Sequence, residues 1–88
     1  MYPAEVEQVL LRLPGVQDAA VVGVPDERMG EVGKAFVVLA VDHPPTDAEI
    51  MAHAREHLAN FKVPRTIEAI SVLPRNPSGK VLKNELRK

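Results

Sequence analysis

The chain has no cysteine, no tryptophan and only three aromatic residues, Tyr2, Phe36 and Phe61, among its 88 positions. The lack of cysteine excludes disulfide staples, thiolate metal ligands and cysteine nucleophiles, and it fits a cytoplasmic protein. No apolar run approaches the ~20 residues of a membrane-spanning helix, so no membrane span is expected. The first fifteen residues mix charges with apolar positions, which is unlike the basic head and apolar block of a signal peptide.

A chain of 88 residues makes one domain with a small core, for which a hydrophobic content of 45% is sufficient. The net charge of −1 is unevenly distributed. Residues 1–61 hold four Lys/Arg and ten Asp/Glu, whereas residues 62–88 hold seven and two. A basic C-terminal third suggests a polyanionic partner, but on charge alone the alternative, an ordinary solvated surface, is favoured.

Hydrophobic spacing in the first half of the chain predicts one helix and two strands. Apolar positions three and four apart predict an amphipathic helix over residues 3–13. Residues 16–24 and 34–41 are rich in Val and Ala and predict strands. The segment from Asp26 to Gly33 is polar, contains two glycines and predicts a loop. Because this connection is short, the two strands are expected to pair antiparallel.

The second half predicts a helix, a strand and a short terminal helix. Thr46 and Glu49 have the spacing of a capping box, so a helix begins there and continues to about residue 59. Residues 66–72 alternate as in a strand with one wet face, and residues 82–86 predict a short helix. The expected fold is therefore α+β, a small three-stranded sheet (an antiparallel hairpin plus a third strand) packed with helices.

A lysine follows a cluster of residues that break regular structure. Pro74, Pro77 and Gly79 predict an exposed loop that carries Lys80. An ammonium group there suits an anion that must be gripped during phosphoryl or acyl-phosphate chemistry. The segment falls short of a phosphate-binding P-loop, which needs a leading glycine and a Ser/Thr after the lysine, where this chain has Pro74 and Val81.

Two of the three histidines have a spacing that can chelate a metal. His53 and His57 lie four residues apart on the predicted helix, but His43 precedes a proline turn and no third ligand is evident. The alternative, that all three are surface or boundary histidines, is favoured. No metal site is therefore expected in this chain.

An aromatic residue and two cations gather at the predicted turn between the second helix and the third strand. Phe61, Lys62 and Arg65 could stack a base and hold phosphate groups. In the alternative interpretation Phe61 closes the end of the core, and the two cations are solvated. The residues alone leave both interpretations open.

Four segments together resemble the small C-terminal domain of adenylate-forming enzymes, the acyl-CoA synthetases and their relatives. They are Tyr2–Glu7, Ala20–Asp26 with Gly30 and Glu31, Phe61–Pro64, and Asn76–Lys83. They occur in the family's order and cover essentially the whole chain. The resemblance implies that residues 1–88 are a single C-terminal (lid) domain whose hinge and N-terminal ATP- and acid-binding domain are absent from this chain.

The resemblance also implies an activity. The full-length enzyme would be an AMP-forming acid–thiol ligase that uses ATP, Mg²⁺ and CoA on a fatty or related carboxylic acid. The chain alone would bind none of these cofactors and would be inactive. The alternatives are the same domain from an aryl-CoA ligase or a nonribosomal-peptide adenylation enzyme and, in another class, a non-enzymatic nucleotide- or nucleic-acid-binding module.

By position in the family's motifs, Lys80 would be the catalytic lysine of acyl-adenylate formation. Phe61 would lie against the adenine of CoA, and Arg65 near the nucleotide phosphates. Some relatives carry a further cation where this chain has Val63, so either the phosphate contacts would be fewer or Lys62 would supply them. The loop residues expected to position the lysine are Pro77, Ser78 and Gly79.

The expected partners follow from the same resemblance. They are the protein's own N-terminal domain, CoA and the acyl-adenylate, together with a lysine acetyltransferase acting at Lys80. Free CoA is favoured over a carrier protein as the acceptor because Phe61 occurs with Arg65. No nucleic acid is expected, since residues 62–88 contain no aromatic platform for stacked bases.

Overall fold

A computed structural model describes residues 3–28 and 30–86 of the protein. Tyr2, the first residue of one expected motif, lies outside the described residues. The elements in chain order are α1 (Pro3–Leu11), β1 (Val16–Asp26), β2 (Gly30–Leu39), α2 (Asp47–His57), the 3₁₀ turn η1 (Asn60–Lys62), β3 (Thr66–Ala69) and α3 (Lys83–Leu86). The strands form one mixed sheet in the order β1-β2-β3, which confirms the predicted α+β class.

The β1–β2 hairpin is antiparallel, as predicted, but it is longer than the sequence indicated. Pairing continues to Asp26 opposite Gly30, so half of the predicted loop, residues 30–33, belongs to β2. The glycines misled the prediction because they are turn residues in most contexts. Here Gly33 lies opposite Gly23 within the ladder, where backbone hydrogen bonds hold the strands without help from side chains.

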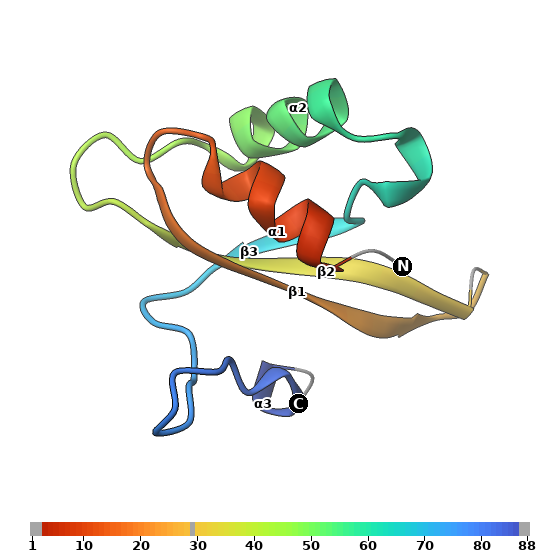
Figure 1. Ribbon diagram of the computed structural model, residues 1–88. Coiled ribbons are helices and arrows are strands. Elements are labelled where there is room, and N and C mark those ends of the chain that lie inside the picture. Colours follow the sequence, from red (N-terminus) through yellow and green to blue (C-terminus); the bar gives the residue numbers. More distant parts are fainter. Residues whose placement is uncertain (1–2, 29, 87–88) are drawn as a thin grey trace.

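The two faces of the sheet are covered by different parts of the chain. In Figure 1, α1 and α2 lie on one face, whereas the C-terminal segment with α3 lies on the other. Because side chains alternate along a strand, β1 contributes to both layers. On the helix side, Val21 packs with Leu10 and Ile50; on the opposite side, Val22 packs with Phe36.

The helices bury the stripes that the sequence indicated. Val6, Val9 and Leu10 are buried in α1, and Ile50 and Ala54 are buried in α2. Burying each of the Val, Leu and Ile side chains contributes about 1.5–3 kcal/mol before the entropy of ordering it is subtracted. Burial of these apolar side chains therefore holds the helices against the sheet.

The predicted capping box is present at the start of α2. The backbone N–H of Glu49 donates to Thr46 Oγ1 at 3.1 Å, and the N–H of Thr46 donates to Glu49 Oε1 at 3.0 Å. The capping box thereby gives hydrogen-bond acceptors to the amides of Thr46 and Glu49. The helix ends at His57, two residues before the predicted end, and η1 follows.

The third strand is shorter than predicted and runs parallel to β2. It spans Thr66–Ala69 rather than residues 66–72. Directly after it, Ile70 and Leu73 pack against the cluster on the sheet face opposite the helices. The chain therefore leaves the sheet at Ala69, and Ile70, partly buried, and Leu73, buried, pack beneath it.

We expect Thr46→Ala to lower the free energy of unfolding by about 1 kcal/mol, because the capping hydroxyl is lost. Chemical denaturation monitored by circular dichroism measures this change. Thr46→Ser is the matched control and should remain close to the unmodified chain. Equal stability of the Ala and Ser variants would contradict a stabilising role for the cap.

Candidate functional site

Lys80 lies in an exposed loop, as predicted, and this loop is held together by hydrogen bonds of its own. Residues 74–82, here called the lysine hairpin, fold back on themselves through an antiparallel bridge between Arg75 and Val81. Inside this bridge, the N–H of Asn76 donates to the carbonyl of Lys80 at 3.0 Å. The backbone carbonyl of Lys80 is therefore held by a hydrogen bond from the opposite side of the turn.

The tip of the lysine hairpin is organised by one side chain. Asn76 Oδ1 accepts from the Ser78 N–H at 3.1 Å, the Ser78 Oγ–H at 2.9 Å and the Lys80 N–H at 3.0 Å. Gly79 has a φ of 88°, which residues with a Cβ rarely adopt. Asn76 was missed as a site residue, although Asn followed by Pro, Ser and Gly is a typical turn composition.

The lysine hairpin is attached to the sheet by apolar and ionic contacts. Leu73, just before it, is only 3% exposed, and Val81 and Leu86 pack against the same cluster. Arg75 forms an ion pair with Asp18 of β1. Beyond the hairpin, Lys83 forms another ion pair with α1.

That second ion pair connects three elements. Lys83 Nζ lies 2.9 Å from Glu7 Oε2. The same carboxylate oxygen accepts the backbone N–H of Val21 at 2.8 Å. Glu7 therefore links α1 to β1 and to the start of α3.

The Lys80 side chain itself is exposed. Within residues 3–28 and 30–86, no other side chain forms an ion pair or hydrogen bond with its ammonium group. It borders an open pocket of about 780 Å³ that Glu7, Lys83 and Val81 also line. A fixed backbone thus presents an unpaired cation to solvent.

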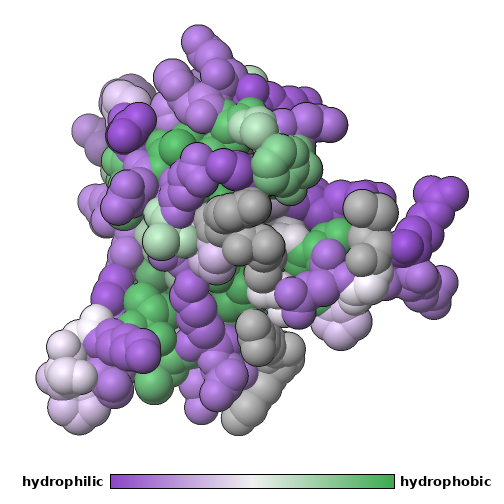
Figure 2. Space-filling view, turned by 45° about the vertical axis from the view of Figure 1, so that its right-hand side comes forward, coloured by the Kyte–Doolittle hydropathy of each residue, from purple (hydrophilic) through white to green (hydrophobic). Residues whose placement is uncertain are grey.

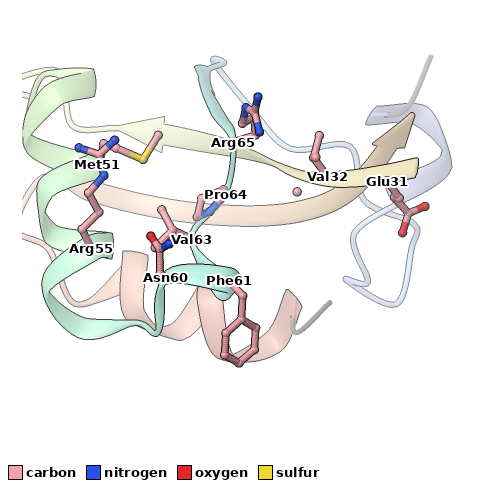
Figure 3. A pocket seen from close by; sticks show the side chains of 10 residues that line it. Glu31, Val32, Met51, Arg55, Asn60, Phe61, Val63, Pro64 and Arg65 are labelled. Atoms are coloured by element: carbon pink, nitrogen blue, oxygen red, sulfur yellow. The ribbon is translucent and has the colours of Figure 1, made fainter. Parts of the chain in front are cut away.

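Phe61 lies at the other candidate surface, at the end of α2. Its side chain is 74% exposed, so the interpretation that Phe61 closes the core is wrong. In Figure 3 its ring projects away from the other labelled side chains. An exposed ring of this kind can stack on a planar ligand.

Lys62 and Arg65, grouped with Phe61 by the sequence, differ in their surroundings. Lys62 Nζ pairs with Glu5 Oε2 at 2.9 Å and lies 5.6 Å from the centroid of the Phe61 ring. The Arg65 side chain is exposed and borders an open pocket of about 540 Å³ beside Phe61. Arg55, which sequence reasoning missed, lines the same pocket from α2 (Figure 3).

Arg55 gave no sequence signal because a single arginine on a helix surface is commonplace. Among the described residues, neither Arg55 nor Arg65 has an ion-pair partner for its guanidinium group. The pocket beside Phe61 therefore combines an exposed aromatic ring with two unpaired cations. Such a combination can hold a base and its phosphate groups.

The two candidate surfaces are on opposite faces of the sheet. Val63, next to Phe61, packs against the core under the helices, whereas Val81, next to Lys80, packs against the opposite cluster. Figure 1 shows η1 on the helix side and the lysine hairpin below the sheet. The structure therefore brings Phe61, Lys62 and Arg65 together but keeps Lys80 apart from them.

The histidines have structural contacts. His53 Nε2 lies 2.8 Å from the carbonyl oxygen of Val9, which joins α2 to α1, and its ring centroid is 4.5 Å from that of His57. In the part of the chain that the structure describes, no three His, Cys, Asp or Glu side chains form a group that could hold a metal ion. The same residues include no helix that is both long and apolar enough to span a bilayer.

Fold and site together define a class: a small α+β domain that exposes a lysine on one side of its sheet and an aromatic ring with cations on the other. Residues 5–80 match the family described as the AMP-binding enzyme C-terminal domain, and the chain belongs to this family.

Two curated relatives illustrate the similarity. The chain is 60% identical over 87 residues, 99% of its length, to a 3-[(3aS,4S,7aS)-7a-methyl-1,5-dioxo-octahydro-1H-inden-4-yl]propanoyl:CoA ligase of Mycobacterium tuberculosis. It is 51% identical over 99% of its length to the fatty acid–[acyl-carrier-protein] ligase ScoC of Streptomyces coeruleorubidus. The chain spans 17% of the length of each of these relatives.

A solved structure has the same fold. The Mycobacterium tuberculosis fatty acyl CoA synthetase superposes with a TM-score of 0.91 at 41% identity, covering 98% of this chain and 17% of that chain. This agreement confirms both the expected fold and the family resemblance.

We expect Asn76→Leu to loosen the lysine hairpin, because three donors lose their shared acceptor. Losing about 1 kcal/mol of net hydrogen-bond free energy should accelerate amide hydrogen exchange at Ser78 and Lys80 about fivefold. Residue-resolved hydrogen exchange by NMR measures this effect. Asn76→Asp keeps an acceptor oxygen and should protect both amides, and equal exchange in the two variants would contradict the assignment.

Proposed function

We propose that the full-length protein is an AMP-forming acid–thiol ligase, an acyl-CoA synthetase, and that residues 1–88 form its C-terminal lid domain. The acid would first react with ATP to give an acyl-adenylate and pyrophosphate. The thiol of CoA would then attack the acyl carbon and release AMP. The observation that carries this proposal is the exposed Lys80, which has no ion-pair partner among the described residues, on a hydrogen-bonded hairpin of a domain in this family.

Lys80 would act in the first step. A carboxylate oxygen approaching the α-phosphate brings two anions together, and negative charge grows on the phosphoryl oxygens. A preorganised ammonium group offsets this repulsion, and removing one such contact typically costs about 3–4 kcal/mol. Pro77, Ser78 and Gly79 would hold the backbone turn from which the ammonium extends.

The surface around Phe61 would act in the second step. Its exposed ring suits the adenine of CoA, and Arg65 suits the phosphate groups of the same molecule. Lys62 is paired with Glu5, so we propose that it supports the Phe61 ring as well as contributing charge to the phosphates. Because Lys80 and Phe61 lie on opposite sheet faces, the domain would rotate between the two steps.

The remaining substrates would be held outside this chain. ATP, Mg²⁺ and the acid would bind to the N-terminal domain, and the described residues contain no cluster suited to a metal ion. We propose a fatty or related carboxylic acid as substrate and free CoA as acceptor. ScoC is named for an acyl-carrier-protein acceptor, so both acceptors belong in the assay.

A rotating lid needs a contact with its partner domain that forms and breaks easily. On the face shown in Figure 2, most of the surface is hydrophilic, and hydrophobic side chains appear between polar ones in separate patches. Interfaces between mobile domains are polar in this way. The surface composition therefore supports a transient contact with the N-terminal domain.

The exposure of Lys80 also suits covalent regulation. We propose that a lysine acetyltransferase modifies this ammonium group, which would remove the charge needed for adenylation. Since the reaction consumes ATP and CoA, which are intracellular metabolites, we propose that the protein acts in the cytoplasm.

Lys80→Gln in the full-length enzyme should reduce adenylation about 10²–10³-fold, because a transition-state contact is lost. Pyrophosphate release measures this first step. Thioester formation from preformed acyl-adenylate is the internal control and should keep most of its rate. An equal fall in both steps would exclude a role restricted to adenylation.

Phe61→Ala should have the converse effect. Loss of a stacking contact worth about 1–3 kcal/mol should raise the KM for CoA by about 5–100-fold and leave pyrophosphate release unchanged. Initial rates of thioester formation at varied CoA concentrations measure this change. Phe61→Tyr keeps a stacking ring and is the matched control; a normal KM in the Ala variant would refute the assignment.

A further inference from the structure

We propose that Arg75 is a positioning residue for Lys80, acting with Asp18 to fix the direction from which the ammonium group is presented. This inference rests on the proposed role of Lys80 in adenylation. It concerns a residue whose guanidinium group hydrogen-bonds the backbone beside Lys80, so it would act through the backbone that carries the ammonium group.

The guanidinium group of Arg75 makes two different contacts at once. Nη1 donates to the carbonyl oxygen of Gly79 at 2.6 Å, directly before Lys80. Nη2 donates to Asp18 Oδ2 on β1. One planar group therefore joins the tip of the lysine hairpin to an edge strand of the sheet.

This double contact requires the shape of arginine. A guanidinium group holds its donors in a rigid plane, so fixing one contact also fixes the direction of the other. A lysine ammonium at the same position could pair with Asp18 but would not hold Gly79 in a defined direction. The geometry thus distinguishes Arg75 from a general positive charge.

A second ionic contact secures the other end of the lysine hairpin. Lys83, three residues after Lys80, pairs with Glu7, which also accepts the Val21 N–H. Lys80 therefore lies between two attachment points, each of which ends on β1 or α1. Within residues 3–28 and 30–86 the Lys80 ammonium group has no partner, whereas the segment that carries it is attached to the rest of the domain.

These attachments determine how the lysine reaches a substrate. A loosely held loop would sample many directions, and most of them would not place the ammonium group against a phosphate. A clamped hairpin moves with the sheet, so rotation of the whole domain delivers the ammonium group in one orientation. A misplacement of about 1 Å in such a group can cost 10²-fold in rate.

The ion pair is too exposed to make Arg75 important for folding. The side chains of Arg75 and Asp18 are 40% and 30% exposed, and exposed ion pairs contribute little to stability. Effects on positioning and on folding can therefore be separated. The Lys34–Glu68 pair, with side chains 30% and 52% exposed, has similar exposure but joins β2 to β3 away from the lysine hairpin.

The test uses the full-length enzyme with Arg75→Ala, Arg75→Lys and Asp18→Asn. We expect Arg75→Ala to lower kcat for pyrophosphate release by up to about 100-fold, with the KM for ATP and acid little changed. Arg75→Lys and Asp18→Asn each keep one of the two contacts and should fall between. Thioester formation from preformed acyl-adenylate should be unaffected, and Lys34→Gln is the control for loss of an exposed ion pair.

A double variant separates positioning from damage to the fold. If Arg75 acts only through Lys80, then Lys80→Gln combined with Arg75→Ala should adenylate no more slowly than Lys80→Gln alone. Additive losses, equal losses in both steps, or an unchanged rate in Arg75→Ala would each overturn the inference. Normal adenylation in Lys80→Gln alone would instead refute the proposed function.

Discussion

Burial of both faces of β1 is the constraint on which the rest of the architecture depends. Ala19, Ala20, Val21 and Val22 are all buried, so each face of this strand needs its own cover. The two helices cover one face, and the segment after β3 covers the other. Phe61 follows the helices that cover one face, and Lys80 belongs to the segment that covers the other. These two residues therefore lie on opposite sides of the same sheet.

The uneven charge along the sequence is largely resolved within the molecule. Lys62, Arg75 and Lys83 of the basic C-terminal third pair with acidic residues of the first eighteen positions. Much of the apparent signal for a polyanionic partner is thus an internal pairing between the two ends of the chain. Arg65 and Lys80 have no such partner among the described residues, and the proposed chemistry assigns each of them a contact with a phosphate group.

Prediction from sequence succeeded where a local pattern of residues is compatible with only one secondary structure. Apolar spacing placed α1, the pair Thr46 and Glu49 placed the start of α2, and the family motifs gave the fold. It failed where tertiary packing overrode local preference. The glycines before Lys34 joined a strand because a partner strand lay opposite them, and the third strand ended early because Ile70 and Leu73 were needed on the other face.

The sequence by itself determined the helices, the pairing of β1 with β2 and the selection of Lys80 as a candidate site residue. These features depend on residues close together in the chain. Only the tertiary structure decided which cations are free and which are paired. The ion pairs of Lys62 and Arg75 each join residues 57 positions apart, and no local pattern encodes such a contact. Folding brings these distant charges within hydrogen-bonding distance, and that proximity separates a structural cation from one available to a substrate.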